Sequence, residues 1–258
     1  MERFAGQVAI VTGGGRGIGA ETARRYVAEG GQVLICDIDP ETARSTAAGL
    51  GEAAAAFAMD VADPKACAEA VERAVERFGA LDHLVNAAVR IRPGMLAELA
   101  IEDWRGAIEV GLTGSFLMGQ AAARWMIATD RPGAIVNLSS VGGRQPYAGT
   151  GAYSTVKAAV IMLSRHMAIE WAGHGIRVNC IAPGHTETPL TAYMKDPEIK
   201  RARGAATPLG RVGQPGDIAG GILFLLSEEA GYVTAADLDI DGGLASSLMN
   251  HMPGRKWD

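Results

Sequence analysis

The chain has 258 residues, of which 48% are hydrophobic and 21% charged, a composition typical of one large α/β domain with a full core. Its formal net charge of −5 argues against a nucleic-acid or anionic-membrane partner. The N-terminal stretch lacks a basic region followed by a long apolar one, and no later stretch is long enough to cross a bilayer, so we expect a cytoplasmic protein without membrane association.

Short apolar runs alternate with longer helical patterns along most of the chain. Most of these runs are dense in Val, Ile and Leu, as in strands covered on both faces. The predicted strands span 7–12, 32–37, 54–60, 81–87, 133–140, 175–183 and 237–241. The predicted helices span 17–29, 40–49, 64–78, 101–128, 152–172 and 215–227. This alternation predicts a single Rossmann-like α/β domain over residues 1–258, doubly wound, with a parallel sheet and helices on both faces.

Two segments do not follow the alternation. Residues 184–214 contain three prolines and are predicted to form an irregular loop that acts as a lid over the substrate. The C-terminal tail, 244–258, carries large apolar side chains that either pack on a neighbouring subunit or fray. These side chains are Leu248, Met249, Met252 and Trp257.

Cysteine and histidine positions indicate neither a disulfide framework nor a metal site. Cys36, Cys67 and Cys180 are odd in number, widely separated and without CxxC spacing. The five histidines also lack the spacing of metal ligands. We therefore expect a reduced, intracellular setting and no bound metal.

The stretch VTGGGRGIG follows the first predicted strand and opens the first predicted helix. Glycine permits a tight turn and a close approach of the backbone, so a pyrophosphate can meet free N–H groups at the helix N-terminus. A glycine-rich turn without a ligand is the alternative, but the strand before it and the helix after it favour a dinucleotide. The predicted cofactor residues of this loop are Gly13, Gly15, Arg16, Gly17, Ile18 and Gly19.

Asp37 ends the second predicted strand and bears on the choice between NAD and NADP. A carboxylate there can accept hydrogen bonds from both ribose hydroxyls, whereas a 2′-phosphate would be repelled by about 4 kcal/mol per charge pair at about 4 Å and an effective dielectric of about 20. Arg16 favours the opposite choice, because a basic residue in the glycine loop could reach a 2′-phosphate. Asp37 is fixed while Arg16 is long and mobile, so the sequence predicts NAD. The alternative for Asp37 is a turn-forming aspartate.

The segment GTGAYSTVKAAV places Tyr153 and Lys157 one turn apart on one face of a predicted helix. An unperturbed phenol titrates at about 10. A neighbouring ammonium and a positive nicotinamide would lower this pKa toward working pH, so Tyr153 could act as base in alcohol oxidation and as acid in the reverse direction. A helix-surface Tyr and Lys without a chemical role is the alternative. The apolar stripe of this helix is formed by Val156, Val160, Leu163, Met167 and Trp171.

Taken together, the motifs resemble those of the short-chain dehydrogenase/reductase family over about residues 6–243. In chain order they are TGGGRGIG, Asp60-Val61, LVNAA, the SS that ends the fifth strand, Tyr153-x-x-x-Lys157, RVNCIAPG and DGG. One such motif is weak, but their joint order is specific. The resemblance implies a seven-stranded parallel sheet, NAD(H)-dependent hydride transfer at a CH–OH carbon, and a homotetramer or homodimer.

The resemblance also implies roles for individual residues. The catalytic serine would be Ser140 rather than Ser139, because it lies thirteen residues before Tyr153. Ser140 would donate a hydrogen bond to the substrate oxygen. Asn179 would support the site. The implied cofactor contacts are Asp60 and Val61 at the adenine, Asn86 and Ala87 along the cofactor, Pro183, Gly184, Thr186 and Thr188 at the nicotinamide, and Tyr153 and Lys157 themselves.

The sequence departs from the family pattern in two motifs. NAAV at 86–89 replaces the family's NNAG. Gly111 stands where the family has an Asn whose side chain helps to bind a proton-relaying water. A glycine inside a helix costs roughly 0.5–1 kcal/mol relative to alanine, so we expect a local kink there. We expect hydride transfer to survive, because Ser140, Tyr153 and Lys157 are present.

Several basic residues follow strands at positions that border the substrate in this family. They are Arg90, Arg92, Arg144 and His185. Guanidinium groups match carboxylate, phosphate or sulfonate oxygens, which favours an anionic or polyhydroxylated substrate. The alternatives are solvated loop arginines and contacts to the pocket rim or the cofactor. Tyr147, Tyr193 and Met194 are candidate pocket walls.

The sequence therefore predicts an NAD-dependent oxidoreductase that acts on a secondary alcohol, ketone or hemiacetal carbon of a small polar molecule. Its predicted partners are that substrate and further copies of the chain. A catalytically impaired NAD-binding or scaffold protein is one alternative, which only Gly111 favours. A lyase or dehalogenase that works without a nucleotide is another, and the glycine loop and Asp37 argue against it.

Overall fold

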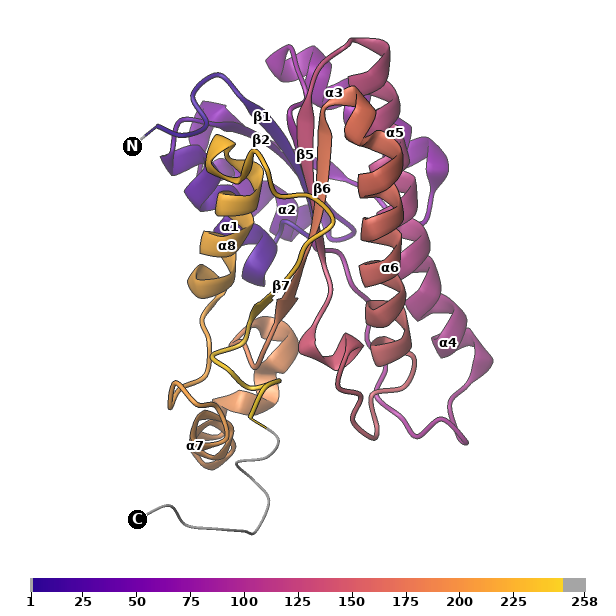
Figure 1. The fold of residues 1–258 in the computed structure, drawn as a ribbon, viewed down its shortest axis with the longest axis vertical. Helices are drawn as coiled ribbons and strands as arrows, with labels where there is room; N and C mark the ends of the chain where they lie inside the picture. The colour runs from indigo at the N-terminus through magenta and orange to yellow at the C-terminus, as the bar shows by residue number, and fades with distance from the viewer. Residues whose placement is uncertain (1, 248–258) are drawn as a thin grey trace.

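The computed structural model describes residues 2–247 and contains one seven-stranded parallel sheet (Figure 1). The strands are β1 (Val8–Thr12), β2 (Gln32–Asp37), β3 (Ala54–Ala58), β4 (His83–Asn86), β5 (Gly133–Leu138), β6 (Ile176–Pro183) and β7 (Asp237–Ile240). Their order in the sheet is β3-β2-β1-β4-β5-β6-β7. All seven predicted strands are confirmed, with ends that differ by at most two residues.

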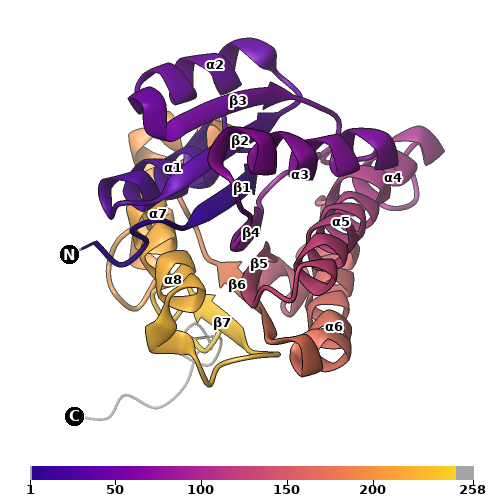
Figure 2. The ribbon, with the colours of Figure 1, turned by 90° about the horizontal axis from the view of Figure 1, so that it is seen from above.

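Helices cover both faces of this sheet, as predicted for a doubly wound fold. They are α1 (Gly17–Ala28), α2 (Pro40–Ala48), α3 (Pro64–Phe78), α4 (Ile101–Ile108), α5 (Gly114–Ala128), α6 (Tyr153–Trp171), α7 (Pro197–Ala205) and α8 (Pro215–Leu226). Figure 2 shows α1 and α8 on one face and α3, α5 and α6 on the other. The Rossmann-like fold class is therefore confirmed.

Each face of the sheet carries its own apolar core. Every residue of β1 is buried, and its side chains alternate between the two cores. Ile10 packs in the core beneath α3, α5 and α6, whereas Val11 packs in the core beneath α1, α2 and α8. A strand that is buried on both faces needs no polar alternation, which explains the continuous apolar runs of the sequence.

The long helix predicted over 101–128 changes its helical type in the middle, around Gly111. A π-helical turn, Glu109–Thr113, separates α4 from α5. Gly111 is buried, and a Cβ atom added to it would lie 2.6 Å from Cγ1 of Val156 on α6. The absence of a side chain therefore lets α6 approach this turn closely.

The segment 184–214 is more regular than predicted. It contains a 3₁₀ stretch, Pro189–Lys195, followed by α7. Asp196 caps α7 by accepting hydrogen bonds from the N–H groups of Glu198 and Ile199, and Pro197 occupies the first helical position. The prediction of an irregular loop is thus wrong for the part of the segment that forms α7.

In the tail predicted over 244–258, residues 248–258 lie outside the described part of the chain, and with them Leu248, Met249, Met252 and Trp257. Within residues 2–247, no helix combines the length and the apolar character needed to cross a membrane.

Candidate active site

The predicted site residues gather at the carboxyl ends of the parallel strands. The glycine loop follows β1, Asp37 ends β2, and Asn86 ends β4. Ser140 lies two residues after β5, and Pro183 ends β6. Because these ends share one edge of the sheet, the topology brings together residues that are far apart in the chain, at the edge where open α/β sheets bind ligands.

The glycine loop leaves room for an anion at the start of α1. Gly13 has φ +62°, and a Cβ atom there would lie 2.9 Å from the carbonyl carbon of Ala87. A Cβ atom on Gly19 would lie 2.3 Å from the carbonyl oxygen of Gly13, so glycine lets α1 pack directly onto the loop. The residue at the N-cap position, Arg16, makes no side-chain capping bond, so the first-turn N–H groups are not covered by it. This cradle fits a pyrophosphate.

Asp37 is held rigidly beside the glycine loop. Its Oδ2 accepts a hydrogen bond from the Gly15 N–H at 2.9 Å, and its Oδ1 accepts one from the Asp39 N–H at 3.1 Å. Asp37 is buried whereas Arg16 is exposed. Each carboxylate oxygen keeps a further lone pair, so the group can still receive ribose hydroxyls.

The residues implied to contact the rest of the cofactor lie along the same edge. Asp60 Oδ1 accepts a hydrogen bond from the Ala62 N–H at 2.9 Å, and Val61 is buried. Asn86 Nδ2 donates to Asn137 Oδ1 at 2.8 Å, and the Ala87 N–H donates to the Thr12 carbonyl at 3.2 Å. These contacts fix the backbone there, and the cofactor roles of the four residues remain predictions.

The segment after β6 is tied to the edge strand. The Gly184 N–H donates to the Ile240 carbonyl at 3.0 Å. Thr186 is buried and donates from Oγ1 to the Gly184 carbonyl at 3.2 Å, while the Thr188 N–H donates to Thr191 Oγ1 at 2.9 Å. These bonds hold the segment in place beside β6.

Two adjacent serines follow β5, and their contacts differ. Ser139 Oγ donates to the Lys157 carbonyl at 2.7 Å, so its hydroxyl proton is already engaged. Ser140 Oγ accepts a hydrogen bond from the Gly142 N–H at 3.1 Å and hydrogen-bonds the side chain of Tyr153. This arrangement favours Ser140 as the serine of the site.

Tyr153 and Lys157 lie on consecutive turns at the start of α6. Lys157 Nζ is 5.8 Å from the centre of the Tyr153 ring and donates to the Leu138 carbonyl at 2.6 Å. Burial lowers the pKa of Lys157 to about 8. Burial also raises the pKa of Tyr153 to about 12, although the hydrogen bond with Ser140 lowers it. The direction for Tyr153 is opposite to the sequence-based expectation, because for the protein alone the cost of burying a phenolate outweighs the stabilising contacts.

The three arginines predicted at the substrate all have acidic neighbours. Arg90 Nη2 and Arg92 Nε each lie 3.8 Å from Asp103 Oδ1. Arg144 points to β7, where its Nε donates to Asp237 Oδ2 at 2.8 Å and its Nη1 pairs with Asp239. Their assignment to the substrate stays a prediction. Arg144 is paired with Asp237 and Asp239, whereas Arg90 and Arg92 share the one carboxylate of Asp103.

His185 lies in the segment after β6, beside Arg203 of α7. Its Nδ1 atom is buried and has no hydrogen-bond partner within residues 2–247. Tyr193 is half-exposed, and Arg203 of α7 lies over its ring, with Cζ 4.9 Å from the ring centre. Sequence reasoning did not single out Arg203, because KRARG reads as a solvated charged run and α7 was not predicted.

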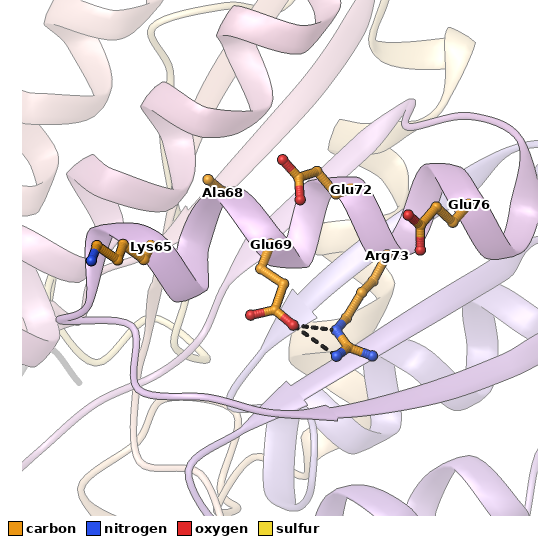
Figure 3. A pocket seen from close by; sticks show the side chains of 6 residues that line it. All are labelled: Lys65, Ala68, Glu69, Glu72, Arg73 and Glu76. Atoms are coloured by element: carbon orange, nitrogen blue, oxygen red, sulfur yellow. Dashed lines mark hydrogen bonds and ion pairs between the residues drawn. The ribbon is translucent and has the colours of Figure 1, made fainter.

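The surface also has hollows that carry none of the predicted site residues. The hollow in Figure 3 is lined by Lys65, Ala68, Glu69, Glu72, Arg73 and Glu76. All six belong to α3, and Glu69 and Arg73 form an ion pair of 2.7 Å, so this is the outer face of a helix. A second hollow includes Gln7, Asp82 and Gly133, at or beside the amino ends of strands, opposite the site. Among residues 2–247, no group of three His, Cys, Asp or Glu side chains could hold a metal ion.

Comparisons with known proteins agree with this geometry. A family model described as enoyl-(acyl carrier protein) reductase matches residues 13–245. The chain is 41% identical over 244 residues to 2,5-dichloro-2,5-cyclohexadiene-1,4-diol dehydrogenase of Sphingobium indicum, covering 93% of this chain and 97% of the relative. It is 42% identical over 246 residues to cis-4-hydroxycyclohexanecarboxylate dehydrogenase of Sinomonas cyclohexanicum, covering 94% and 98%. It is 39% identical over 251 residues to sorbitol dehydrogenase of Cereibacter sphaeroides, covering 93% and 98%.

Proposed function

Because the chain belongs to the short-chain dehydrogenase/reductase family, we propose that it is an NAD-preferring dehydrogenase of small polar secondary alcohols. The protein is an oxidoreductase that acts on CH–OH groups by hydride transfer with a nicotinamide cofactor. The proposal concerns the cofactor preference, the residues that act and the class of substrate.

The arrangement of three side chains carries the proposal: Ser140 hydrogen-bonds Tyr153, and the Lys157 ammonium lies one turn beyond, 5.8 Å from the Tyr153 ring centre. Ser140 Oγ would donate to the substrate oxygen and hold it beside the Tyr153 hydroxyl. Tyr153 Oη would take the hydroxyl proton as the carbinol carbon loses its hydride, and it would return a proton in the reduction. When bound, the nicotinamide supplies the carbon that accepts the hydride.

Lys157 is placed to control the charge of Tyr153. In the protein alone the pKa of Tyr153 is raised to about 12 by burial, so oxidation requires added positive charge close to the phenol. The Lys157 ammonium lies one turn away, and its own pKa of about 8 lets it gain or lose a proton near neutral pH. In the direction of ketone reduction, a protonated Tyr153 is already the required acid.

The position of Asp37 supports NAD rather than NADP. Two backbone N–H groups fix its carboxylate at the end of β2, where a ribose would lie in this fold. A 2′-phosphate would meet that negative charge, whereas ribose hydroxyls would donate to it. Arg16 is exposed and not fixed there, so it does not offset the carboxylate.

The relatives support a hydroxylated substrate of small size. The three named above are dehydrogenases of a cyclohexadiene diol, a hydroxycyclohexane carboxylate and sorbitol. We propose that this chain likewise takes a cyclic secondary alcohol or a polyol with further polar groups. NADH formation with such a panel, compared with NADPH formation from NADP, is the test, and no reduced cofactor with any member would contradict the proposal.

We also propose that the chain works as a homo-oligomer, a tetramer or dimer, in the cytoplasm. Large apolar side chains are exposed on α5 and α6, where a monomer would leave them in water. Phe116, Met162 and Ile169 are 40%, 52% and 77% exposed. Light scattering on the purified protein gives the molecular mass in solution, and a monomer at micromolar concentration would contradict this part.

No comparison supports the non-catalytic scaffold that the sequence left open. Its sole support is Gly111, and all the relatives reported above are named as dehydrogenases. Cofactor binding without turnover on the full panel would favour it.

A further inference from the structure

The charge of Arg203 has no counter-charge within the described chain. No ion pair and no hydrogen bond from its guanidinium forms with any of residues 2–247, and its one side-chain contact of this kind is the Tyr193 ring. Two other cations of the same segment are paired, Lys200 with Glu187 at 2.7 Å and Arg211 with Asp217 at 2.6 Å. Arg203 is also only partly exposed, so water does not fully solvate it.

The contact with Tyr193 leaves the hydrogen-bonding capacity of Arg203 unused. A guanidinium that lies over an aromatic ring is attracted by the face of the ring, but its five N–H donors point outward in its own plane. The Tyr193 ring therefore fixes the plane of the guanidinium group, while none of its N–H groups donates a hydrogen bond to the ring. Such a fork is shaped for the two oxygens of a carboxylate.

Two tyrosine side chains, Tyr193 and Tyr147, connect Arg203 with the reacting groups. Burial and Tyr193 raise the pKa of Tyr147, while the charge of Arg203 lowers it. Tyr147 in turn stands beside the catalytic serine, since a Cβ atom on Gly142 would lie 3.2 Å from Tyr147 Cε1 and 3.4 Å from Ser140 Oγ. Tyr147 and Tyr193 both raise the pKa of Tyr153.

His185 adds a second unsatisfied group at the same place. Its Nδ1 is buried without a hydrogen-bond partner in the described residues. Burial and then the charge of Arg203 lower the pKa of His185, while a hydrogen bond to the Arg203 backbone raises it, so the His185 ring lies beside this residue. A buried polar atom without a partner is costly, which is expected where a ligand supplies the partner.

We propose that Arg203 binds a carboxylate on the substrate, away from the carbon that is oxidised, and that His185 hydrogen-bonds a polar group of the same molecule. This inference rests on the proposed function and narrows its substrate class to hydroxy acids. It also assigns the substrate anion to an arginine of α7. The three arginines predicted from the sequence, Arg90, Arg92 and Arg144, each have an acidic neighbour instead.

The experiment compares an acid with its neutral isostere. The probes are 4-hydroxycyclohexanecarboxylate and 4-hydroxycyclohexanecarboxamide, each oxidised with NAD, and the readout is the ratio of their kcat/KM values. We expect the wild type to favour the acid by at least about tenfold and Arg203→Gln to lower that ratio by about tenfold or more. Arg203→Lys keeps the charge but loses the fork, so it should lose about threefold to tenfold.

Arg201→Gln is the matched control, because Arg201 lies on the same helix and is exposed. Its ratio should stay within about twofold of the wild type, as expected for a solvated surface charge. A ratio that changes less than about threefold in Arg203→Gln, or equally in both variants, would overturn the inference. If the wild type oxidises neutral alcohols but shows no preference for the acid, this inference fails while the proposed function stands. Absence of NADH formation with every alcohol would instead contradict the proposed function.

Discussion

Gly111 and Val156 are matched in size across the contact between the π-helical turn and α6. A Cβ atom on Gly111 would lie 2.6 Å from Cγ1 of Val156, which is buried. Real Cβ atoms essentially never come this close to another heavy atom, so the valine occupies the place that a side chain at 111 would need. The glycine at position 111, where the family has an Asn, is therefore accompanied by a valine at position 156 that fills the space of the missing side chain.

This relationship predicts that Gly111→Asn is destabilising on its own. Overpacking a buried contact costs about 1–3 kcal/mol of the free energy of unfolding. Adding Val156→Ala to Gly111→Asn should recover part of that loss, because the alanine removes the clashing methyl groups. Chemical denaturation of both single variants and the double variant gives the coupling energy. Additive losses in the double variant would contradict the match.

The same double variant tests whether hydride transfer needs an Asn at 111. We expect the wild type to be active, because Ser140, Tyr153 and Lys157 are all present. Turnover in the double variant should then rise by no more than about threefold, which corresponds to less than 1 kcal/mol in the barrier. A wild type without turnover beside an active double variant would show that the relay was essential.

Replacing Asp37 is predicted to change the preference between NAD and NADP. Asp37→Ser removes the charge that would repel a 2′-phosphate and the acceptors offered to the ribose. We expect the ratio of NAD to NADP affinity, measured by calorimetry, to fall by about tenfold or more. The ratio is its own control for folding, because both cofactors use the same glycine loop. An unchanged ratio would assign the preference to other residues.

Arg144 is predicted to serve stability more than substrate binding. Arg144→Gln leaves Asp237, whose side chain is 4% exposed, without its cation. Since Arg144 itself is 31% exposed, we expect a loss of about 1–3 kcal/mol in the free energy of unfolding, below the cost for a fully buried pair.

Arg24→Gln is the control, because Arg24 pairs with Glu21 on the outside of α1. It should lose no more than about 0.5 kcal/mol. KM for a hydroxy acid should change by less than about twofold in Arg144→Gln, as for any residue outside the binding contacts. A large rise in KM without loss of stability would support the assignment of Arg144 to the substrate.

The buried pair of Tyr26 and His83 predicts how stability depends on pH. Tyr26 Oη and His83 Nδ1 are 2.7 Å apart, and burial lowers the pKa of His83 to about 4, with Arg177 also lowering it and Asp82 raising it. In the unfolded chain the His83 imidazole binds a proton below about pH 6.5, whereas in the folded chain it stays neutral down to about pH 4. Stability should therefore fall as pH falls through this window, by on the order of 3 kcal/mol from this residue.

Urea denaturation across that pH range measures the effect. His83→Asn keeps a polar side chain but cannot titrate there, so the difference between wild type and variant should shrink as pH falls from neutral toward about 4. A constant difference at all pH values would contradict the assignment to His83.

The strands and the core of this fold could be predicted from the sequence because they depend on the residue pattern within short stretches of the chain. A strand such as β1, buried on both faces, needs a continuous apolar run, and the turn after it needs glycine. The placement of Tyr153 and Lys157 one turn apart could be predicted for the same reason, since a spacing of four residues on a helix fixes their relative position.

Other features depend on contacts that the sequence does not reveal. In α7 only Gly204 is buried, so the helix carries no apolar stripe that would predict it. The pairing of Arg144 with Asp237 joins residues far apart in the chain. The direction of the pKa shift of Tyr153 depends on burial, which only the packed structure defines.

The most direct test of the central claim is the initial rate of NADH formation from a cyclic secondary alcohol by three proteins. Tyr153→Phe removes the hydroxyl that carries the proton, so its rate should fall by about a hundredfold or more while NAD affinity is largely kept. Tyr232→Phe makes the same chemical change at a fully exposed position and should match the wild type. A Tyr153→Phe rate within about threefold of the wild type would contradict the assignment of Tyr153 as the acid and base of this enzyme.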